Sequence, residues 1–382
     1  MTNTTSVRIP FNRVSLSGRE LEYMQQAVEK GHISGDGPFT KKCHQFFEER
    51  LGVEKALLTT SCTHALEMSA ILCHIQAGDE VIVPSFTFVS TVNAFVLRGA
   101  KAIFADIRPD TLNIDESRVE ALITDRTKAI VAVHYAGVAC EMDALLDICR
   151  RYGLELIEDN AHGLLGKYKG RYLGTFGAFA TQSFHETKNV SCGEGGVLLI
   201  NDKQYADRAE IIREKGTNRS RFFRGQVDKY SWVDIGSSYL PSDLLAAFLY
   251  AQLENIDTIQ QQRKAIWQTY HDGLKNWAAA QGVRLPIVPD HCEQTWHMFY
   301  LLPPDLESRQ RFIQHLRDQQ ISAVFHYLPL HHSDMGRALG GMKADCPVTV
   351  EMSDRLVRLP FYNSLSPSDQ ARVIDAVKSF VC

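Results

Sequence analysis

A single lysine, Lys188, stands in a stretch whose composition is unusual for a surface loop. It follows the apolar run FATQSF at 179–184 and precedes the glycine-rich stretch GEGG at 193–196. A loop lysine is ordinarily solvated and does no chemistry. An amine that is shielded from water, however, loses its proton more easily and becomes a nucleophile toward carbonyl carbons. The stretch therefore indicates either a solvated lysine or an amine nucleophile.

A second candidate, Asp159, ends the strongly apolar run LELIED at 154–159. A carboxylate at this point should be buried, and a buried carboxylate needs a partner. A helix cap or a structural ion pair would satisfy it, and so would the protonated ring nitrogen of a bound cofactor. His162 lies three residues later and could reach the same ligand, although it could also be a structural histidine with its hydrogen bonds made in the core.

An anion site is the third candidate feature. In TTSCTHALEMSA, residues 59–70, small hydroxyl residues precede an apolar pattern with helical spacing. The free N–H groups at the start of a helix bind anions. The alternative is a Ser/Thr cap with a purely structural role. Phe88 follows the apolar run at 80–85 and is either a core residue or an aromatic platform for a ligand.

The elements that must position these residues form a repeating pattern. Short β-branched runs alternate with helical patterns such as 88–99 and 142–153, which predicts an α/β fold with a large, mainly parallel sheet. The expected strands lie at 80–85, 101–107, 128–135, 154–159, 179–184 and 196–201. Ligands of such sheets bind beyond the carboxyl ends of the strands. An anion site, a buried aspartate and a shielded lysine at that edge match the phosphate, pyridine nitrogen and aldehyde of pyridoxal phosphate (PLP).

The length of 382 residues is consistent with two domains. A long helical pattern runs from Ser242 to about Ala280 and opens with a capping signal, Ser242 and Asp243, just after Pro241. We expect this pattern to carry the chain out of a large PLP-binding α/β domain, residues 1–255, into a smaller α+β domain, residues 256–382.

The composition argues against several classes of protein. With 45% hydrophobic and 23% charged residues it is typical of a soluble globular protein, and a net charge of −4 gives no general attraction to nucleic acid or acidic lipid. The nine cysteines form no CxxC pair, and the histidines at 326, 331 and 332 match no helical zinc motif, so we expect no metal. The stretch MTNTTSVRIPFNRV lacks a signal-peptide pattern, and no apolar run approaches the roughly 20 residues of a membrane helix, so we expect a cytoplasmic protein.

Together, these motifs resemble those of the DegT/DnrJ/EryC1/StrS family of sugar-nucleotide aminotransferases. The resemblance covers nearly the whole chain and rests on TTSCTHALEMSA, PSFTFVSTVNAF, IEDNAHG, SFHETKNVSCGEGG and VFHYLPLH, in this order and spacing. The segments REKGTNRSRFFRGQVDKYSW and DIGSSYLPSD are similar to the branch that makes dTDP-4-amino-4,6-dideoxy-D-galactose for enterobacterial common antigen and related polysaccharides. The resemblance implies a PLP-dependent transaminase with the aspartate-aminotransferase-like fold (type I), and L-glutamate and dTDP-4-keto-6-deoxy-D-glucose as its substrates.

The resemblance also implies a role for each candidate at the cofactor. Lys188 corresponds to the Schiff-base lysine that also moves the proton, and Asp159 to the aspartate that keeps the pyridine nitrogen protonated. His162 lies at the position near the phenolic oxygen, and Phe88 where an aromatic ring stacks on the cofactor. The implied phosphate ligands are Cys62, Thr63 and Ser183.

The substrate side is implied partly by resemblance and partly by charge. By resemblance, His326 and Tyr327 lie near the sugar, and Ser238 replaces the usual asparagine that reaches the phosphate across a homodimer with shared active sites. The basic segment 219–229 is either a solvated loop or a charged lip for the substrate's diphosphate, because arginine suits phosphate geometry. The candidates that the segment contributes are Arg219, Arg224 and Lys229.

Several alternative functions stay open at this point. A relative that eliminates water with pyridoxamine phosphate typically carries histidine at the position of Lys188, which counts against that reaction. A noncatalytic sugar-nucleotide sensor would bind the cofactor without turnover. An aminotransferase that makes the 4-amino gluco epimer, or acts on another keto sugar nucleotide, would need the same cofactor residues. A nicotinamide dehydrogenase is disfavoured because no GxGxxG opens a helix after the first strand.

Overall fold

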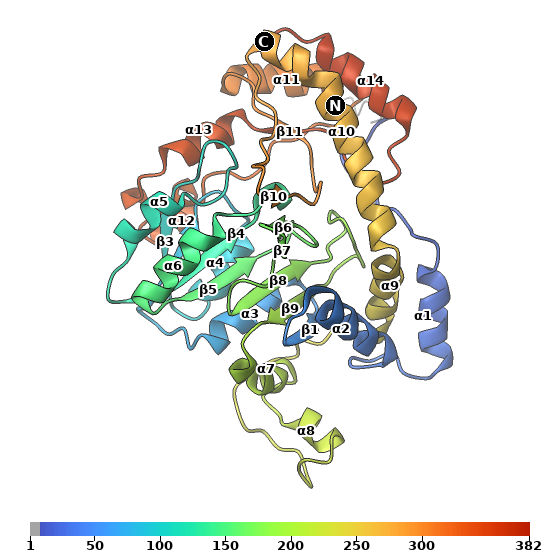
Figure 1. Ribbon diagram of the computed structural model, residues 1–382, viewed down its shortest axis with the longest axis vertical. Coiled ribbons are helices and arrows are strands. Elements are labelled where there is room, and N and C mark those ends of the chain that lie inside the picture. The colour runs from blue at the N-terminus through green and yellow to red at the C-terminus, as the bar shows by residue number, and fades with distance from the viewer. Residues whose placement is uncertain (1–7) are drawn as a thin grey trace, which may run out of the picture.

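The computed structural model describes residues 8–382 (Figure 1). Residues 1–7, which belong to the stretch examined above for a signal peptide, lie outside the described part. At the centre is a seven-stranded sheet with the order β1-β9-β8-β5-β4-β2-β3. Four of its six strand pairs are parallel, namely β2 with β3, β2 with β4, β4 with β5, and β5 with β8. The α/β fold with a large, mainly parallel sheet is therefore confirmed.

Every strand expected from the sequence is present in this sheet. They are β2 (Glu80–Pro84), β3 (Lys101–Ala105), β4 (Thr127–Val133), β5 (Glu155–Asp159), β8 (Phe179–Ser183) and β9 (Gly196–Ile200). The edge strand β1 (Lys55–Thr59), which pairs antiparallel with β9, was not expected. Its short run KALLT has neither strand alternation nor β-branched residues before Thr59, so the pattern alone does not separate a strand from a helix.

Helices cover both faces of the sheet (Figure 1). The α-helices in the N-terminal two thirds of the chain are α1 (Glu20–Glu29), α2 (Pro38–Leu51), α3 (Cys62–Leu72), α4 (Val89–Val96), α5 (Glu116–Val119), α6 (Met142–Tyr152), α7 (Ala206–Arg213), α8 (Arg219–Phe223) and α9 (Asp243–Glu254), of which α8 lies away from the sheet. A small sheet joins β10 (Cys292–Glu293), β6 (Lys167–Tyr168) and β7 (Arg171–Tyr172). None of the helices in residues 8–382 is long and apolar enough to cross a membrane.

The long helical pattern from Ser242 forms two helices instead of one. Helix α9 begins after Ser242, whose side chain accepts a hydrogen bond from the N–H of Leu245 at 3.4 Å. It ends at Asn255, whose backbone (φ −107°, ψ 14°) leaves the helical region, and α10 (Ile256–Gln281) follows at once. The apolar spacing continues through this break, which explains why the sequence pattern does not reveal it.

The C-terminal part of the chain has a hydrophobic core of its own. It is built by α10, α11 (Leu306–Asp318), α14 (Pro367–Lys378) and the two-stranded sheet of β11 (Tyr300–Leu301) and β12 (Val357–Arg358). The helices α12 (Asp334–Ala338) and α13 (Pro347–Arg355) also belong to this part of the chain but lie outside that core. Tyr270, Phe299 and Phe312 are fully buried there, and Ile9 joins them from the N-terminal end. We propose the division into residues 1–255 and 256–382, with Ile9 as an N-terminal contribution to the smaller core.

Candidate active site

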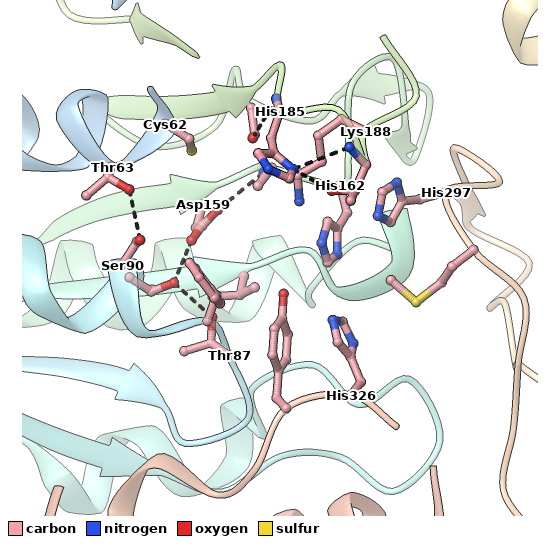
Figure 2. A pocket seen from close by; sticks show the side chains of 18 of the residues that line it. Cys62, Thr63, Thr87, Ser90, Asp159, His162, His185, Lys188, His297 and His326 are labelled. Carbon is pink, nitrogen blue, oxygen red and sulfur yellow. Dashed lines mark hydrogen bonds between the residues drawn. The ribbon is translucent and has the colours of Figure 1, made fainter. Parts of the chain in front are cut away.

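A cavity of about 830 Å³ opens at the carboxyl ends of the central strands. Val133, Asp159 and Ser183, which line it, are the last residues of β4, β5 and β8. The C-terminal part of the chain closes its other side. Figure 2 shows how side chains from these separate elements face one space. Among the residues expected from the sequence, the cavity brings together Cys62, Thr63, Phe88, Asp159, His162, Ser183, Lys188, His326 and Tyr327.

Asp159 is buried at the bottom of this cavity, and its partners in the described chain are neutral. The Thr91 hydroxyl donates to Asp159 Oδ2 at 2.7 Å, and the N–H of Ala161 donates to Oδ1 at 3.2 Å. Thr87 contacts the Thr91 hydroxyl at 2.8 Å and so orients it. No lysine, arginine or histidine in residues 8–382 forms an ion pair with Asp159. A buried carboxylate held by neutral donors can receive a cationic N–H from a ligand.

Lys188 lines the same cavity and is only partly exposed. Its loop is held by a hydrogen bond from its own N–H to the carbonyl of His185 at 2.9 Å. Burial lowers the pKa of the Lys188 amine to about 8, and the positive charge of Arg358 acts in the same direction, while Cys62 and Asp159 oppose the shift. The neutral, nucleophilic amine is therefore abundant near pH 8, where an ordinary lysine is almost fully protonated.

The start of α3 forms the polar end of the cavity. Ser61 caps the helix, because its hydroxyl accepts from the N–H of His64 at 3.1 Å. Cys62 and Thr63 follow in the first turn, and Thr63 donates to Ser90 at 2.8 Å. A Cβ on Gly196 would lie 2.5 Å from the backbone nitrogen of Cys62, so only glycine lets β9 approach this turn. Burial raises the pKa of the Cys62 thiol to about 12, so no thiolate competes with an anion here.

Histidines line the wall opposite the start of α3 (Figure 2). The His162 ring stacks on His297, with ring centroids 4.1 Å apart and planes at 17°. Burial holds the pKa of both rings well below the usual value, so both are neutral. His297 Nδ1 lies 2.8 Å from Asn189 Oδ1, whereas His162 Nδ1 is buried and has no hydrogen-bond partner in residues 8–382. His162 therefore has a ring nitrogen free for a ligand, and His297 holds the ring in place.

The sugar-side candidates form an aromatic wall. His326 stacks on Tyr327 at 3.7 Å, and its Nδ1 contacts the Tyr135 hydroxyl at 2.7 Å. Phe88 is 57% exposed, so the alternative interpretation of Phe88 as a core residue is wrong.

The next histidine along the chain, His331, points away from the cavity, because its ring binds the hydroxyl of Ser85. Across residues 8–382, no group of three potential metal-ligating side chains gathers at one point.

The candidates from the basic segment 219–229, together with Ser238, do not line the Lys188 cavity of their own chain. Arg219, Arg224 and Ser238 line a separate cavity of about 780 Å³, and Lys229 lines neither of the two. Arg219 pairs with Glu214 at 3.2 Å and Arg224 with Glu210 at 2.8 Å. Figure 1 shows that α8 and its flanking loops project away from the central sheet. Two aromatic residues of this projecting segment are largely exposed, Phe223 at 69% and Trp232 at 79%.

Several residues of the cavity were not predicted as site residues from the sequence, and His297 and Arg358 are two that can bind a ligand. Both lie in the C-terminal part, where no strand end of the large sheet marks them. Residue 297 opens the short stretch HMFY at 297–300, in which a histidine stands close to two aromatic residues, and nothing in the pattern around residue 358 sets Arg358 apart.

The sheet topology and the cavity define the class of protein, an aminotransferase with the aspartate-aminotransferase-like fold. The aminotransferase TlmJ from Streptoalloteichus hindustanus has this architecture, with a TM-score of 0.88 and 29% identity over 98% of both chains. The sugar aminotransferase Spr1654 from Streptococcus pneumoniae, in its PLP form, superposes with a TM-score of 0.87 over 97% of this chain and 98% of its own, and at 24% identity this likeness shows the fold.

Residues 15–378 match the DegT/DnrJ/EryC1/StrS aminotransferase family, and the chain belongs to it. The spore coat polysaccharide biosynthesis protein SpsC of Bacillus subtilis is 32% identical over 381 residues, which cover 98% of this chain and 97% of SpsC. The family and the class of enzyme expected from the sequence are confirmed.

Proposed function

We propose that this aminotransferase moves the amino group of L-glutamate to C4 of dTDP-4-keto-6-deoxy-D-glucose. The products are 2-oxoglutarate and dTDP-4-amino-4,6-dideoxy-D-galactose. The observation that carries the chemistry is that Asp159, the last residue of β5, and Lys188, which follows β8, face one cavity that ends at the start of α3. A sugar substrate is supported by the name of SpsC, which assigns that relative to polysaccharide biosynthesis. The dTDP group and the C4 position rest on the resemblance of residues 213–232 and 234–243.

The cofactor is pyridoxal phosphate, as the sequence predicted for a member of this family. When bound, it supplies an aldehyde that condenses with amines and a ring that withdraws electrons from the reacting carbon. The residues present fit it. The free N–H groups of α3 and the side chains of Thr63 and Ser183 suit the phosphate, and the neutrally held carboxylate of Asp159 suits the ring nitrogen. His162, with its free Nδ1, suits the phenolic oxygen.

Two residues of this chain then do the proton chemistry. The Lys188 amine is neutral at moderately alkaline pH, so Nζ can remove the proton from the α-carbon of the amino acid and later deliver one to C4 of the sugar. Asp159 would face the ring nitrogen, and the Thr91 hydroxyl and the Ala161 N–H, which both donate to its side chain, hold the carboxyl group in place. Phe88, exposed at the cavity wall, is available to stack on the ring.

The diphosphate of the sugar nucleotide needs a basic anchor, and the basic segment 219–229 does not line the Lys188 cavity of its own chain. We infer a homodimer in which residues 219–238 complete the partner's active site. Two observations support this arrangement. The segment lies apart from its own Lys188 cavity, and its exposed aromatics Phe223 and Trp232 are the kind of surface that another protein covers. Arg219 and Arg224 then supply the charge for the diphosphate, and Ser238 reaches the cofactor phosphate.

Shared sites predict that two inactive variants restore each other. In a mixed dimer of Lys188→Ala and Arg224→Glu subunits, one site combines the intact Lys188 of one chain with the intact Arg224 of the other. Random mixing should return about a quarter of the wild-type rate, because half of the dimers are hybrids and each has one intact site. The rate is measured as 2-oxoglutarate released from L-glutamate and the keto sugar nucleotide.

The matched control is a mixture of Lys188→Ala with Asp159→Asn subunits. Both residues belong to the site of their own chain, so no hybrid site is intact and no activity should return. Subunit exchange is verified with two differently tagged chains. If exchange occurs and the Arg224→Glu mixture also stays inactive, the sites are not shared through Arg224.

The reaction is tested by incubating the enzyme with L-glutamate and dTDP-4-keto-6-deoxy-D-glucose and analysing the product by proton NMR. An axial amine at C4 gives a small coupling between H3 and H4, which identifies the galacto product. A large coupling identifies the gluco epimer and refutes the stereochemistry. If no 4-keto-6-deoxy sugar nucleotide is converted, the proposed substrate is wrong. A protein that binds the cofactor but forms no 2-oxoglutarate from L-glutamate with any keto sugar nucleotide would instead be a noncatalytic sensor.

A further inference from the structure

The side-chain amide of Asn189, the residue after Lys188, is buried and fixed in one orientation. Its Nδ2 donates to the backbone carbonyl of Thr295 at 2.8 Å and to Gln260 Oε1 at 3.2 Å. Gln260 is fixed in turn, because its Nε2 donates to the backbone carbonyl of Leu164 at 3.0 Å. A backbone carbonyl accepts hydrogen bonds and cannot donate them. Turning either amide over would set oxygen atoms against each other, so Asn189 Oδ1 is an acceptor.

This orientation fixes the tautomer of His297. Asn189 Oδ1 lies 2.8 Å from His297 Nδ1, so Nδ1 must carry the proton of this hydrogen bond. Burial holds the pKa of the ring well below its usual value, so the ring is neutral. In a neutral imidazole the second nitrogen has no proton. His297 Nε2 is therefore an acceptor, and no hydrogen bond within residues 8–382 reaches it.

The backbone that carries His297 is held as firmly as its ring. The buried guanidinium of Arg263 donates from Nε to the carbonyl of Trp296 at 3.0 Å and from Nη2 to that of His297 at 2.5 Å. Trp296 has a φ of +49°, in the left-handed region that bulky residues seldom adopt. The Thr295 hydroxyl donates to the carbonyl of His162 at 2.6 Å. These bonds hold the Nε2 acceptor in one place before any ligand binds.

His297 lines the cavity near the reacting amine. Besides burial and His162, the charge of Lys188 lowers the pKa of the ring, and Figure 2 shows the ring near Lys188. An unprotonated Nε2 repels the carboxylates of an amino donor, since those groups are also acceptors. It can bind a hydroxyl group. In the proposed sugar, the 3-hydroxyl is bonded to the carbon next to C4, which must face Lys188.

We propose that His297 Nε2 accepts a hydrogen bond from the 3-hydroxyl of the sugar, and that Asn189 is the positioning residue that keeps Nε2 unprotonated. The pair then selects 4-keto sugars with a hydroxyl at C3 over 3-deoxy sugars. A shielded acceptor that is left without a donor costs free energy, which makes this selection effective. This inference rests on the proposed function, because it assigns one part of the sugar site.

Binding without turnover tests the sugar contact. The pyridoxamine phosphate form of the enzyme does not react with an amino sugar, so dTDP-4-amino-4,6-dideoxy-D-galactose and its 3-deoxy counterpart serve as ligands in calorimetry. Wild type should bind the 3-deoxy counterpart about 5- to 10-fold more weakly, the loss for one neutral hydrogen bond. His297→Phe keeps a flat ring that can stack on His162 but has no acceptor, so it should bind both ligands equally.

His271→Phe is the matched control for this variant. His271 stacks on Trp267, with ring centroids 5.2 Å apart, and does not line the cavity. The control should therefore keep the wild-type preference for the 3-hydroxyl. His297→Leu also removes the acceptor and serves if the phenylalanine variant does not fold.

Neutron diffraction tests the tautomer directly. Crystals of the PLP-bound enzyme exchanged into heavy water should show deuterium on His297 Nδ1 and none on Nε2. Asn189→Leu removes the acceptor that fixes the tautomer but leaves His297 in the chain. Its preference for the 3-hydroxyl should fall below about threefold, measured by the same calorimetry.

Deuterium on His297 Nε2 in the wild-type crystal would overturn the proposal. Equal binding of both amino sugars by wild type, or an undiminished preference in a folded His297→Phe protein, would overturn it as well. If wild type binds neither amino sugar, the proposed substrate itself fails, which is a different result from binding that ignores the 3-hydroxyl.

Discussion

Replacing Lys188 with alanine is expected to lower turnover by about 10⁴-fold or more, while the protein still folds and binds PLP. The substitution removes both the amine nucleophile and the proton carrier from the cavity. The start of α3 and the carboxylate of Asp159 are untouched, so cofactor binding should persist. Turnover is measured as 2-oxoglutarate formed with saturating substrates, and PLP content by absorbance after release in alkali.

Lys188→Arg is the informative control for this variant. It keeps a cation in the cavity, but a guanidinium does not lose its proton near neutral pH. We expect it to be nearly as inactive as the alanine variant, because the reaction needs a neutral amine and not a positive charge. An alanine variant that kept more than about one hundredth of the wild-type rate would show that another group moves the proton.

Replacing Asp159 with asparagine should lower kcat by about 10²- to 10³-fold and change the KM for the sugar nucleotide by less than about threefold. The amide retains the shape of the carboxylate but loses the charge that favours a protonated ring nitrogen. This charge matters most when the reacting carbon is electron-rich. Its removal should therefore lower kcat and leave the KM for the sugar nucleotide nearly unchanged. Steady-state kinetics with the keto sugar nucleotide separates kcat from KM.

Thr91→Val is the matched comparison for Asp159→Asn. It removes the 2.7 Å hydrogen bond to Asp159 Oδ2 but leaves the charge in place. Because the charge is retained and the Ala161 N–H still donates to Oδ1, we expect kcat to fall only about tenfold, the low end of the loss for one hydrogen bond to a charged group. Wild-type turnover in Asp159→Asn would exclude the proposed role of the carboxylate.

The strand ends explain why the sequence predicted as much of the site as it did. Asp159 and Ser183 end apolar strands, and Lys188 follows one closely, so the topology of a parallel sheet alone brings them to one edge. His297 and Arg358 reach the same cavity from the C-terminal part, through tertiary packing that leaves no local pattern. The break at Asn255 was hidden for a related reason, since the apolar spacing runs through it.

The basic segment shows a different limit of sequence reasoning. Its charge indicated an anion site, but the pattern does not say in which active site the charge acts. The structure separates Arg219 and Arg224 from Lys188 within one chain. Only an experiment on mixed dimers therefore tests their proposed role.

The central claim is that Lys188 carries the cofactor, and borohydride reduction tests it most directly. The reagent reduces the link between PLP and the amine that holds it, so the cofactor becomes a permanent, fluorescent label. Peptide mapping by mass spectrometry should then find the label on Lys188, in the peptide that contains the sequence HETKNVSCGEGG. A label on any other lysine, or a PLP-saturated protein that acquires no label, would contradict the account.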